Sequence, residues 1–201
     1  HTSIKTLPAE IGLLQSLRSL YCTNTPLTEL PRKIGNLSNL KVLYLDNTSL
    51  KTLPAEIGRL NALACLSCAN TQLTKIPREI GTLRQLQVLQ LGSNRLSDLP
   101  VEMGNLKKLK NLRLDYNKFK VMPDVIGELT SLTELDLSEN QLTTLSPKIG
   151  KLSQLKVLYL SFNPLQHLPE ELSHLKELNK IYVNEAARNN NATLLRKMGL
   201  Y

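Results

Sequence analysis

A repeat of 23 residues is the feature that most constrains how this chain can fold. A leucine-proline pair, or a close variant of it, marks each unit, and eight units follow one another without insertion or deletion. The first residues of these pairs are Leu7, Leu30, Leu53, Ile76, Leu99, Met122, Leu145 and Leu168. A fixed period of this size is typical of a solenoid, in which each unit forms one turn of a stack.

Each full unit carries apolar residues that a single turn has no means of burying. In the second unit they are Leu30, Ile34, Leu37, Leu40, Leu43, Leu45 and Leu50. When turns stack, each apolar residue lies over its copy in the next unit, and one continuous core results. The period therefore predicts burial of the same positions in every unit.

The strand and turn of the unit are visible in "LYCTNTPL", residues 20–27. Because side chains alternate along a strand, we expect Leu20 and Cys22 to point inward and Tyr21 outward. Later in the unit, Asn94, Asn117, Asn140 and Asn163 occupy a position where an amide can bond the backbone of two adjacent turns. The first three units have Thr25, Thr48 and Thr71 there, with asparagine one position earlier. Threonine has one hydroxyl, so a looser ladder is expected in these units.

The stretches "LPAEIGLLQSL", "LPRKIGNLSNL" and "IPREIGTLRQL" carry a recognisable motif. From about Ile4 to Val183 the chain resembles leucine-rich repeat proteins of the 23-residue "LPxxIGxLxxL" class. That class is typical of Ras-pathway scaffolds, plant Ras-group proteins and bacterial repeat proteins, including secreted effectors. One unit, "LSPKIGKLSQL", departs by moving its proline to Pro147. The resemblance implies an α/β solenoid, a curved right-handed horseshoe with parallel strands on the concave face and short helical or 3-10 turns on the convex face.

The predicted organisation has two parts. Residues 1–183 form the repeat array, a partial first unit plus about eight units, and residues 184–201 form a capping segment. In that segment Asn191 is expected to N-cap a short helix, "ATLLRKM", that ends at Gly199. Its apolar residues, Leu194, Leu195 and Met198, would close the core. The first residues, "HTSIKTLP", align with "NTSLKTLP" and show no cap, so we expect a natural protein that continues upstream or a trimmed chain.

The apolar runs and cysteines bear on where the protein works. No run approaches the roughly 18 apolar residues of a membrane span, and "HTSIKTLP" lacks the features of a signal peptide. Cys65 and Cys68 should point to opposite sides, and Cys22 lies two units from Cys68, about 10 Å at strand spacing. That separation exceeds disulfide reach, so three free thiols are expected. We therefore predict an intracellular, cytoplasmic protein, or a bacterial effector secreted into a host cell.

Catalytic features are weak in this sequence. Neither His167 nor His174 falls where the repeat would bring it to a serine, aspartate or cysteine. The glycines of the "IG" pairs recur at one packing position and form no phosphate loop. We expect no enzyme activity, no cofactor and no metal site.

Aromatic residues gather where the repeat predicts the concave surface. The outward strand position is occupied in turn by Tyr21, Tyr44, Ser67, Gln90, Arg113, Asp136, Tyr159 and Tyr182. The turn that follows adds Tyr116 and Phe162, so this surface holds six of the eight Tyr and Phe residues. Exposed aromatics commonly anchor protein interfaces. The alternative is that tyrosines such as Tyr21 and Tyr44 only stack on each other, at about 4.8 Å along the sheet.

Charge argues against nucleic acid as the partner. The predicted surface has six basic residues, Arg18, Lys41, Lys110, Arg113, Lys156 and Lys180, and six acidic ones, Asp46, Asp115, Glu134, Asp136, Glu139 and Glu185. The chain's net charge of +8 therefore lies elsewhere. A nucleic-acid groove would concentrate its basic residues on one face. We expect the acidic residues of units five and six to pair with Arg113 and Lys110 rather than to bind a metal.

These observations predict a monomeric, non-enzymatic module that binds a protein through its concave face. The candidate contact residues are Tyr21, Tyr44, Arg113, Tyr116, Asp136, Tyr159, Phe162 and Tyr182. The resemblance favours a bacterial protein, such as a secreted effector. Two alternatives remain: the sensing segment of a plant-type immune receptor, and the targeting or substrate-recognition domain of a larger enzyme.

Overall fold

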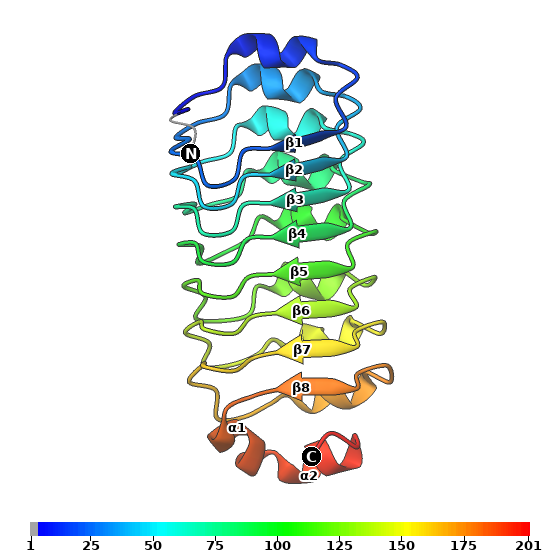
Figure 1. Cartoon of the computed structure of the whole chain (residues 1–201). Coiled ribbons are helices and arrows are strands. Elements are labelled where there is room, and N and C mark those ends of the chain that lie inside the picture. Colours follow the sequence, from blue (N-terminus) through cyan, green and yellow to red (C-terminus); the bar gives the residue numbers. More distant parts are fainter. Residues whose placement is uncertain (1–3) are drawn as a thin grey trace.

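One parallel sheet of short strands runs the length of the molecule (Figure 1). The computed structural model describes residues 4–201. In this range the strands are β1 (Ser19–Tyr21), β2 (Val42–Tyr44), β3 (Cys65–Ser67), β4 (Val88–Gln90), β5 (Asn111–Arg113), β6 (Glu134–Asp136), β7 (Val157–Tyr159) and β8 (Lys180–Tyr182). They lie side by side in chain order. Residues 1–3, which the sequence assigns to the array, lie outside the described range.

The repeat period sets the register of the sheet. Tyr21 pairs with Tyr44 at one end, and Tyr159 pairs with Tyr182 at the other. In each case the partners are equivalent residues of consecutive units. Residues at equivalent positions of consecutive units are therefore neighbours in the sheet. This arrangement confirms the predicted leucine-rich repeat solenoid.

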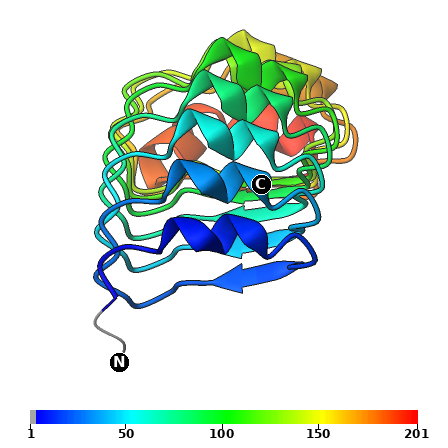
Figure 2. The ribbon, with the colours of Figure 1, turned by 90° about the horizontal axis from the view of Figure 1, so that it is seen from above.

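A row of 3-10 helices covers the side opposite the sheet (Figure 2). For the described residues these are η1 (Ala9–Leu13), η2 (Arg32–Asn36), η3 (Ala55–Arg59), η4 (Arg78–Thr82), η5 (Val101–Asn105), η6 (Asp124–Glu128), η7 (Pro147–Lys151) and η8 (Glu170–His174). Most follow a proline, such as Pro31 with φ −66°, because its ring restricts the backbone before the helix.

The unit that departs from the motif begins its helix in another way. Ser146 is the N-cap of η7, and its hydroxyl oxygen accepts a hydrogen bond from the backbone N–H of Lys148. The same hydroxyl donates to Asp124 of the preceding unit at 2.6 Å. Pro147 occupies the first turn, where a missing N–H costs no helical bond. The shifted proline therefore leaves room for a serine cap.

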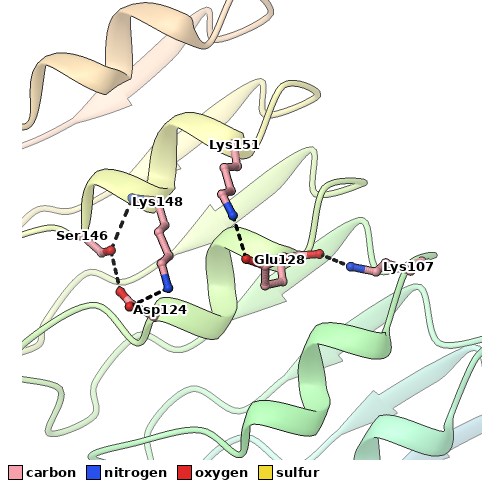
Figure 3. Close-up of polar contacts among 6 residues, drawn as sticks. All are labelled: Lys107, Asp124, Glu128, Ser146, Lys148 and Lys151. Carbon is pink, nitrogen blue, oxygen red and sulfur yellow. Dashed lines mark hydrogen bonds and ion pairs between the residues drawn. The ribbon is translucent and has the colours of Figure 1, made fainter.

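Ion pairs join the neighbouring helices η6 and η7 on this side (Figure 3). Lys148 Nζ lies 2.8 Å from a carboxylate oxygen of Asp124, and Lys151 Nζ lies 2.9 Å from one of Glu128. Lys107 donates to the backbone carbonyl of Glu128 at 2.7 Å. All of these side chains are at least partly exposed, so solvent screens the pairs.

The glycine of each "IG" pair lets successive helices approach closely. A Cβ atom on Gly35 would lie 2.6 Å from the carbonyl oxygen of Glu56 in the next unit. On Gly58 it would lie 2.5 Å from the carbonyl oxygen of Glu79. Glycine is therefore required here by the close contact between turns.

The core lies between the sheet and the helices and is continuous along the stack. In the second unit, the residues predicted to be buried are Leu30, Ile34, Leu37, Leu40, Leu43, Leu45 and Leu50, and all are buried. The alternation is also confirmed, since Cys22 is buried and Tyr21 is 62% exposed. Leu20 is only partly buried because it belongs to the first strand of the sheet.

The inner asparagine ladder forms as predicted. Asn94 donates through its amide nitrogen to the carbonyls of Cys68 and Leu91, and its oxygen accepts from the N–H of Leu73. Thr48, at the same position in an earlier unit, makes one bond of 2.8 Å to the carbonyl of Leu45. The threonine units therefore have fewer inner bonds.

A second, outer ladder accompanies the threonine units, and the sequence did not predict it. Asn47 donates to Asn24 at 2.9 Å, and Asn70 donates to Asn47 at 2.7 Å. Their φ angles are 55°, 55° and 50° for Asn24, Asn47 and Asn70, in the left-handed region that asparagine tolerates. The displaced asparagines thus bond unit to unit on the outside of the turn.

Two helices end the chain where the sequence predicted one. They are α1 (Glu185–Asn190) and α2 (Ala192–Lys197). Asn184 caps α1 by accepting from the N–H of Ala187. Asn191 is at the N-cap position of α2, as predicted, but its side chain makes no capping bond. Its amide oxygen accepts from the N–H of Leu168, and its nitrogen donates to the carbonyl of Ala187.

The end of α2 agrees better with the prediction. Gly199 has φ 71°, and Leu195 is fully buried against the last unit. Leu194 and Met198 are partly buried beside it. None of the helices in the described part of the chain has the length and apolarity that crossing a membrane requires.

Candidate protein-binding surface

The strand face consists of the outward side chains of β1 to β8 and the turns that follow these strands. Its central column is continuous, since each member pairs with its copy in the next strand: Tyr21, Tyr44, Ser67, Gln90, Arg113, Asp136, Tyr159 and Tyr182. Six of the eight candidate residues therefore lie in one row. The other two, Tyr116 and Phe162, lie in the turns after β5 and β7.

The tyrosines of β1 and β2 meet edge to face. The ring centroids of Tyr21 and Tyr44 are 5.3 Å apart and their planes are 86° to each other. The alternative considered from the sequence, contact between these two rings, is therefore present, but with edge-to-face rather than stacked geometry. The thiol of Cys65 on β3 donates a hydrogen bond of 3.7 Å to the Tyr44 hydroxyl. The same contact with Cys65 is the main reason that the pKa of Tyr44 is raised.

The tyrosines of β7 and β8 do stack. The centroids of Tyr159 and Tyr182 are 4.8 Å apart, with an angle of 4° between the planes. Tyr182 is still 43% exposed. A flat aromatic surface therefore lies at this end of the strand face.

The strand face is polar around Ser67 and Gly92. Ser67 is buried, donates to a carboxylate oxygen of Asp46 at 2.5 Å, and lies 3.1 Å from the side-chain oxygen of Gln90. Asp46 also accepts from the N–H of Ala69. Gly92 makes room for the carboxylate of Asp115, which a Cβ atom would contact at 2.5 Å. Polar residues of the central column, Ser67, Gln90, Arg113 and Asp136, thus separate the two aromatic ends.

The charged residues of units five and six interact as the sequence predicted for Arg113. Its guanidinium lies 3.3 Å from a carboxylate oxygen of Glu134. Burial, and then the charge of Asp136, raise the pKa of Asp115 more than Arg113 lowers it. Across residues 4–201, no three His, Cys, Asp or Glu side chains are grouped so that they could hold a metal ion.

Tyr116 and Phe162 differ from the strand residues in their backbone. Their φ angles are 52° and 58°, and their side chains are 57% and 72% exposed. Sequence reasoning placed them on the surface but missed this conformation. The available signal was the asparagine at the same position in the first three units, because asparagine favours the left-handed region.

The cysteines are unpaired, as expected. Cys22 and Cys68 are buried in the core, and Cys65 is partly buried on the strand face. Burial raises the pKa of Cys68, so its thiol stays protonated.

Two family models match most of the chain. One, described as a leucine-rich repeat region, matches residues 2–73 and 65–141. The other, described as a leucine rich repeat, matches residues 130–185. No curated protein sequence matches significantly.

Several solved structures resemble the chain. A leucine-rich repeat protein of Leptospira interrogans is 38% identical with a TM-score of 0.82, over 92% of this chain and 53% of that protein. The repeat domain of the type III effector XopL is 25% identical with a TM-score of 0.77, over 93% of this chain and 75% of that domain.

A plant receptor shows the same architecture. The ectodomain of the receptor kinase GASSHO1/SCHENGEN3 from Arabidopsis thaliana, in complex with Casparian strip integrity factor 2, is 29% identical with a TM-score of 0.77. The match covers 92% of this chain and 24% of that ectodomain. The chain thus spans about half the length of the Leptospira protein and about a quarter of the ectodomain.

Proposed function

The chain belongs to the leucine-rich repeat family, and we propose that it is a non-enzymatic module that binds a protein partner through its strand face. The observation that carries this proposal is the two aromatic pairs, Tyr21 with Tyr44 and Tyr159 with Tyr182, at the two ends of the strand face. Each pair has one clearly exposed ring, that of Tyr21 or Tyr182. Tyrosine offers a large, rigid contact area, and such residues dominate binding energy at interfaces.

The fold itself does not require tyrosine in this column. The same outward position is occupied by Ser67, Gln90 and Arg113 in the intervening strands, with the register unchanged. Stacking between neighbours would stabilise the sheet slightly, by about 0.5–1.5 kcal/mol per pair. This stacking energy does not require an exposed ring, yet the Tyr21 side chain is 62% exposed. Exposure of the rings favours binding over stacking alone.

We further propose a bacterial origin, with delivery into a host cell as the specific role. The likeness to the Leptospira protein and to the type III effector XopL supports this proposal. The free thiols of Cys22, Cys65 and Cys68 support work in a reducing compartment. The plant receptor, solved in complex with its factor, supports the alternative of a sensing segment. A recognition domain of a larger enzyme is the second alternative.

The test is capture of partners by the wild-type protein and by the Tyr44→Ala, Tyr159→Ala double variant. We expect the double variant to lose a partner that the wild type captures from host or bacterial lysate, with a melting temperature within a few degrees of wild type. Tyr201→Ala is the matched control, because this tyrosine packs on Arg196 away from the strand face. Equal capture by the double variant and the wild type would exclude the two aromatic ends as the contact site.

A further inference from the structure

A row of residues with left-handed backbone lies in the turns of the strand face. They have φ angles between 50° and 58° and are Asn24, Asn47, Asn70, Ser93, Tyr116, Glu139 and Phe162. Each turn is bonded to the next: the N–H of Tyr116 donates to the carbonyl of Ser138, and that of Glu139 donates to the carbonyl of Ser161. The side chains therefore follow one another at about the strand spacing of 4.8 Å. We call the part formed by Tyr116, Glu139 and Phe162 the turn ridge.

The turn ridge contains residue types that this backbone disfavours. Asparagine tolerates positive φ, and Asn24, Asn47 and Asn70 use it to build the outer ladder. Bulky aromatic residues are uncommon there. Tyr116 and Phe162 also remain 57% and 72% exposed, so their rings gain little from packing within the chain. The fold alone does not account for two aromatic residues at these positions.

A carboxylate lies between the two rings. Glu139 is partly buried and stands between Tyr116 and Phe162 in the row, because consecutive turns bond to each other. Its charge is the main cause of a raised pKa for the Tyr116 hydroxyl. Asp115 directly precedes Tyr116 in the chain, and Asp136 is the last residue of β6.

The carboxylates of this region have no direct ion-pair partner in the described part of the chain. Within residues 4–201, no Lys, Arg or His nitrogen makes an ion pair with Asp115, Asp136 or Glu139. The nearest guanidinium in the column, that of Arg113, pairs with Glu134 instead. These unpaired carboxylates occur in a protein with a net charge of +8. The turn ridge is therefore a local negative, aromatic surface on a positive molecule.

We propose that the turn ridge receives an arginine side chain from a basic segment of the protein partner, an inference that rests on the proposed function. A guanidinium stacks on aromatic faces and pairs with carboxylates, and Tyr116, Glu139 and Phe162 present both kinds of group. Arginine suits this surface better than lysine because its planar group can lie against a ring and bond a carboxylate at once. The overall positive charge opposes unspecific attraction of basic peptides, so binding depends on this local surface.

The direct test is an NMR titration of isotope-labelled protein with the blocked peptide Ac-Gly-Gly-Arg-Gly-Gly-NH2. We expect saturable shifts at the amides of Tyr116, Glu139 and Phe162, with a dissociation constant in the millimolar range. The lysine peptide should bind several-fold more weakly, and glutamine or glutamate peptides should cause no saturable shift. Equal shifts with the glutamine peptide, or no shift at the turn ridge, would overturn the proposal.

Variants separate binding from folding. Phe162→Asn should weaken arginine-peptide binding about tenfold or more while raising the melting temperature, because asparagine suits the φ of 58°. Glu139→Gln should weaken binding similarly without a large change in stability. Ser93→Asn, in the same row but outside the turn ridge, is the matched control and should bind like wild type. Unchanged binding by Phe162→Asn and Glu139→Gln would contradict the assignment of the site.

Failure of the turn-ridge proposal can be distinguished from failure of the proposed function. The Tyr44→Ala, Tyr159→Ala double variant leaves the turn ridge intact, so it should still bind the arginine peptide. If that variant also captures the protein partner normally, the proposed contact through the tyrosine pairs fails. If capture is lost but wild-type protein does not bind the arginine peptide, the proposal for the turn ridge fails and the proposed function stands.

Discussion

The side-chain amide of Asn47 donates a hydrogen bond of 2.9 Å to the side-chain oxygen of Asn24, its counterpart one unit earlier. The oxygen of Asn47 accepts a bond of 2.7 Å from Asn70. These bonds join turns whose backbone is left-handed, with φ near 55° at Asn47. The outer ladder therefore combines a conformational preference with a contact between units, and the two contributions can be measured separately.

Replacing Asn47 with alanine should lower the free energy of unfolding by about 1–2 kcal/mol, since an alanine Cβ is disfavoured at positive φ. The substitution also removes both ladder bonds. Asn47→Gly is the matched control, because glycine adopts this backbone freely but forms no side-chain bond. We expect a smaller loss for the glycine variant in urea unfolding. Equal decreases in the free energy of unfolding for the two variants would show that strain of the left-handed backbone is not the main cause of the destabilisation.

Adding a methyl group to the helix glycines should have different effects at two positions. At Gly58 a Cβ would lie 2.5 Å from the backbone oxygen of Glu79. We expect Gly58→Ala to destabilise by about 1–3 kcal/mol, as overpacking generally does. At Gly104 the nearest atom would be Cβ of Glu128 at 3.3 Å, so Gly104→Ala should be close to neutral. Thermal unfolding of both variants checks this, and similar losses would contradict the role given to the close turn contact.

The ion pairs of η6 and η7 predict how acid affects stability. Hydrogen bonds from Lys148 and Lys151 are the main causes of lowered pKa values for Asp124 and Glu128 respectively. A carboxyl whose pKa is lower in the folded state stabilises the fold above its ordinary pKa, near pH 4, and loses this effect as pH falls through the folded value. We therefore expect the stability to decrease with acidification below about pH 4.

The measurement is the melting temperature of wild type and of the Asp124→Asn, Glu128→Gln double variant as a function of pH. The variant should start lower at neutral pH and decrease less on acidification. High salt should reduce the difference, because the side chains are exposed to solvent. Glu170→Gln is a control at an exposed glutamate on η8. Parallel pH curves for wild type and the double variant would exclude a contribution from these pairs.

The repeat period made most of the strand face predictable from sequence. Because equivalent residues of consecutive units pair in the sheet, the spacing alone placed Arg113 beside Asp136 and Tyr159 beside Tyr182. The inner ladder followed from the position of the asparagines, such as Asn94. In each case, equivalent positions have the same environment in every unit, so the sequence pattern predicts the contact.

Features that differ between copies could not be predicted in this way. The pairs Tyr21–Tyr44 and Tyr159–Tyr182 have the same register, but one is edge to face and the other stacked. The hydrogen bond between Cys65 and Tyr44 depends on a cysteine at a strand position that other residue types occupy in the other units. The left-handed backbone of Phe162 was hidden because its residue type does not favour that conformation. The helix α1 falls outside the repeat, where the period holds no information.

The last prediction concerns residues 184–201, which we propose cap the repeat array. Leu195 of α2 is fully buried, and the amide of Asn191 joins Leu168 of the last unit to α1. Leu195→Ala should destabilise by about 2–5 kcal/mol, the usual cost of removing a buried leucine side chain.

In a repeat protein each unit is stabilised mainly by its neighbours. Loss of the Leu195 side chain should therefore destabilise the adjacent strand, β8, first. Hydrogen exchange should therefore increase at β8 amides in the Leu195→Ala variant while amides of β4 keep their protection. Thr193→Ala is the control, because this residue is exposed on the same helix. Uniform loss of protection along the sheet would favour one cooperative unit, and unchanged exchange at β8 would show that α2 does not support the last turn.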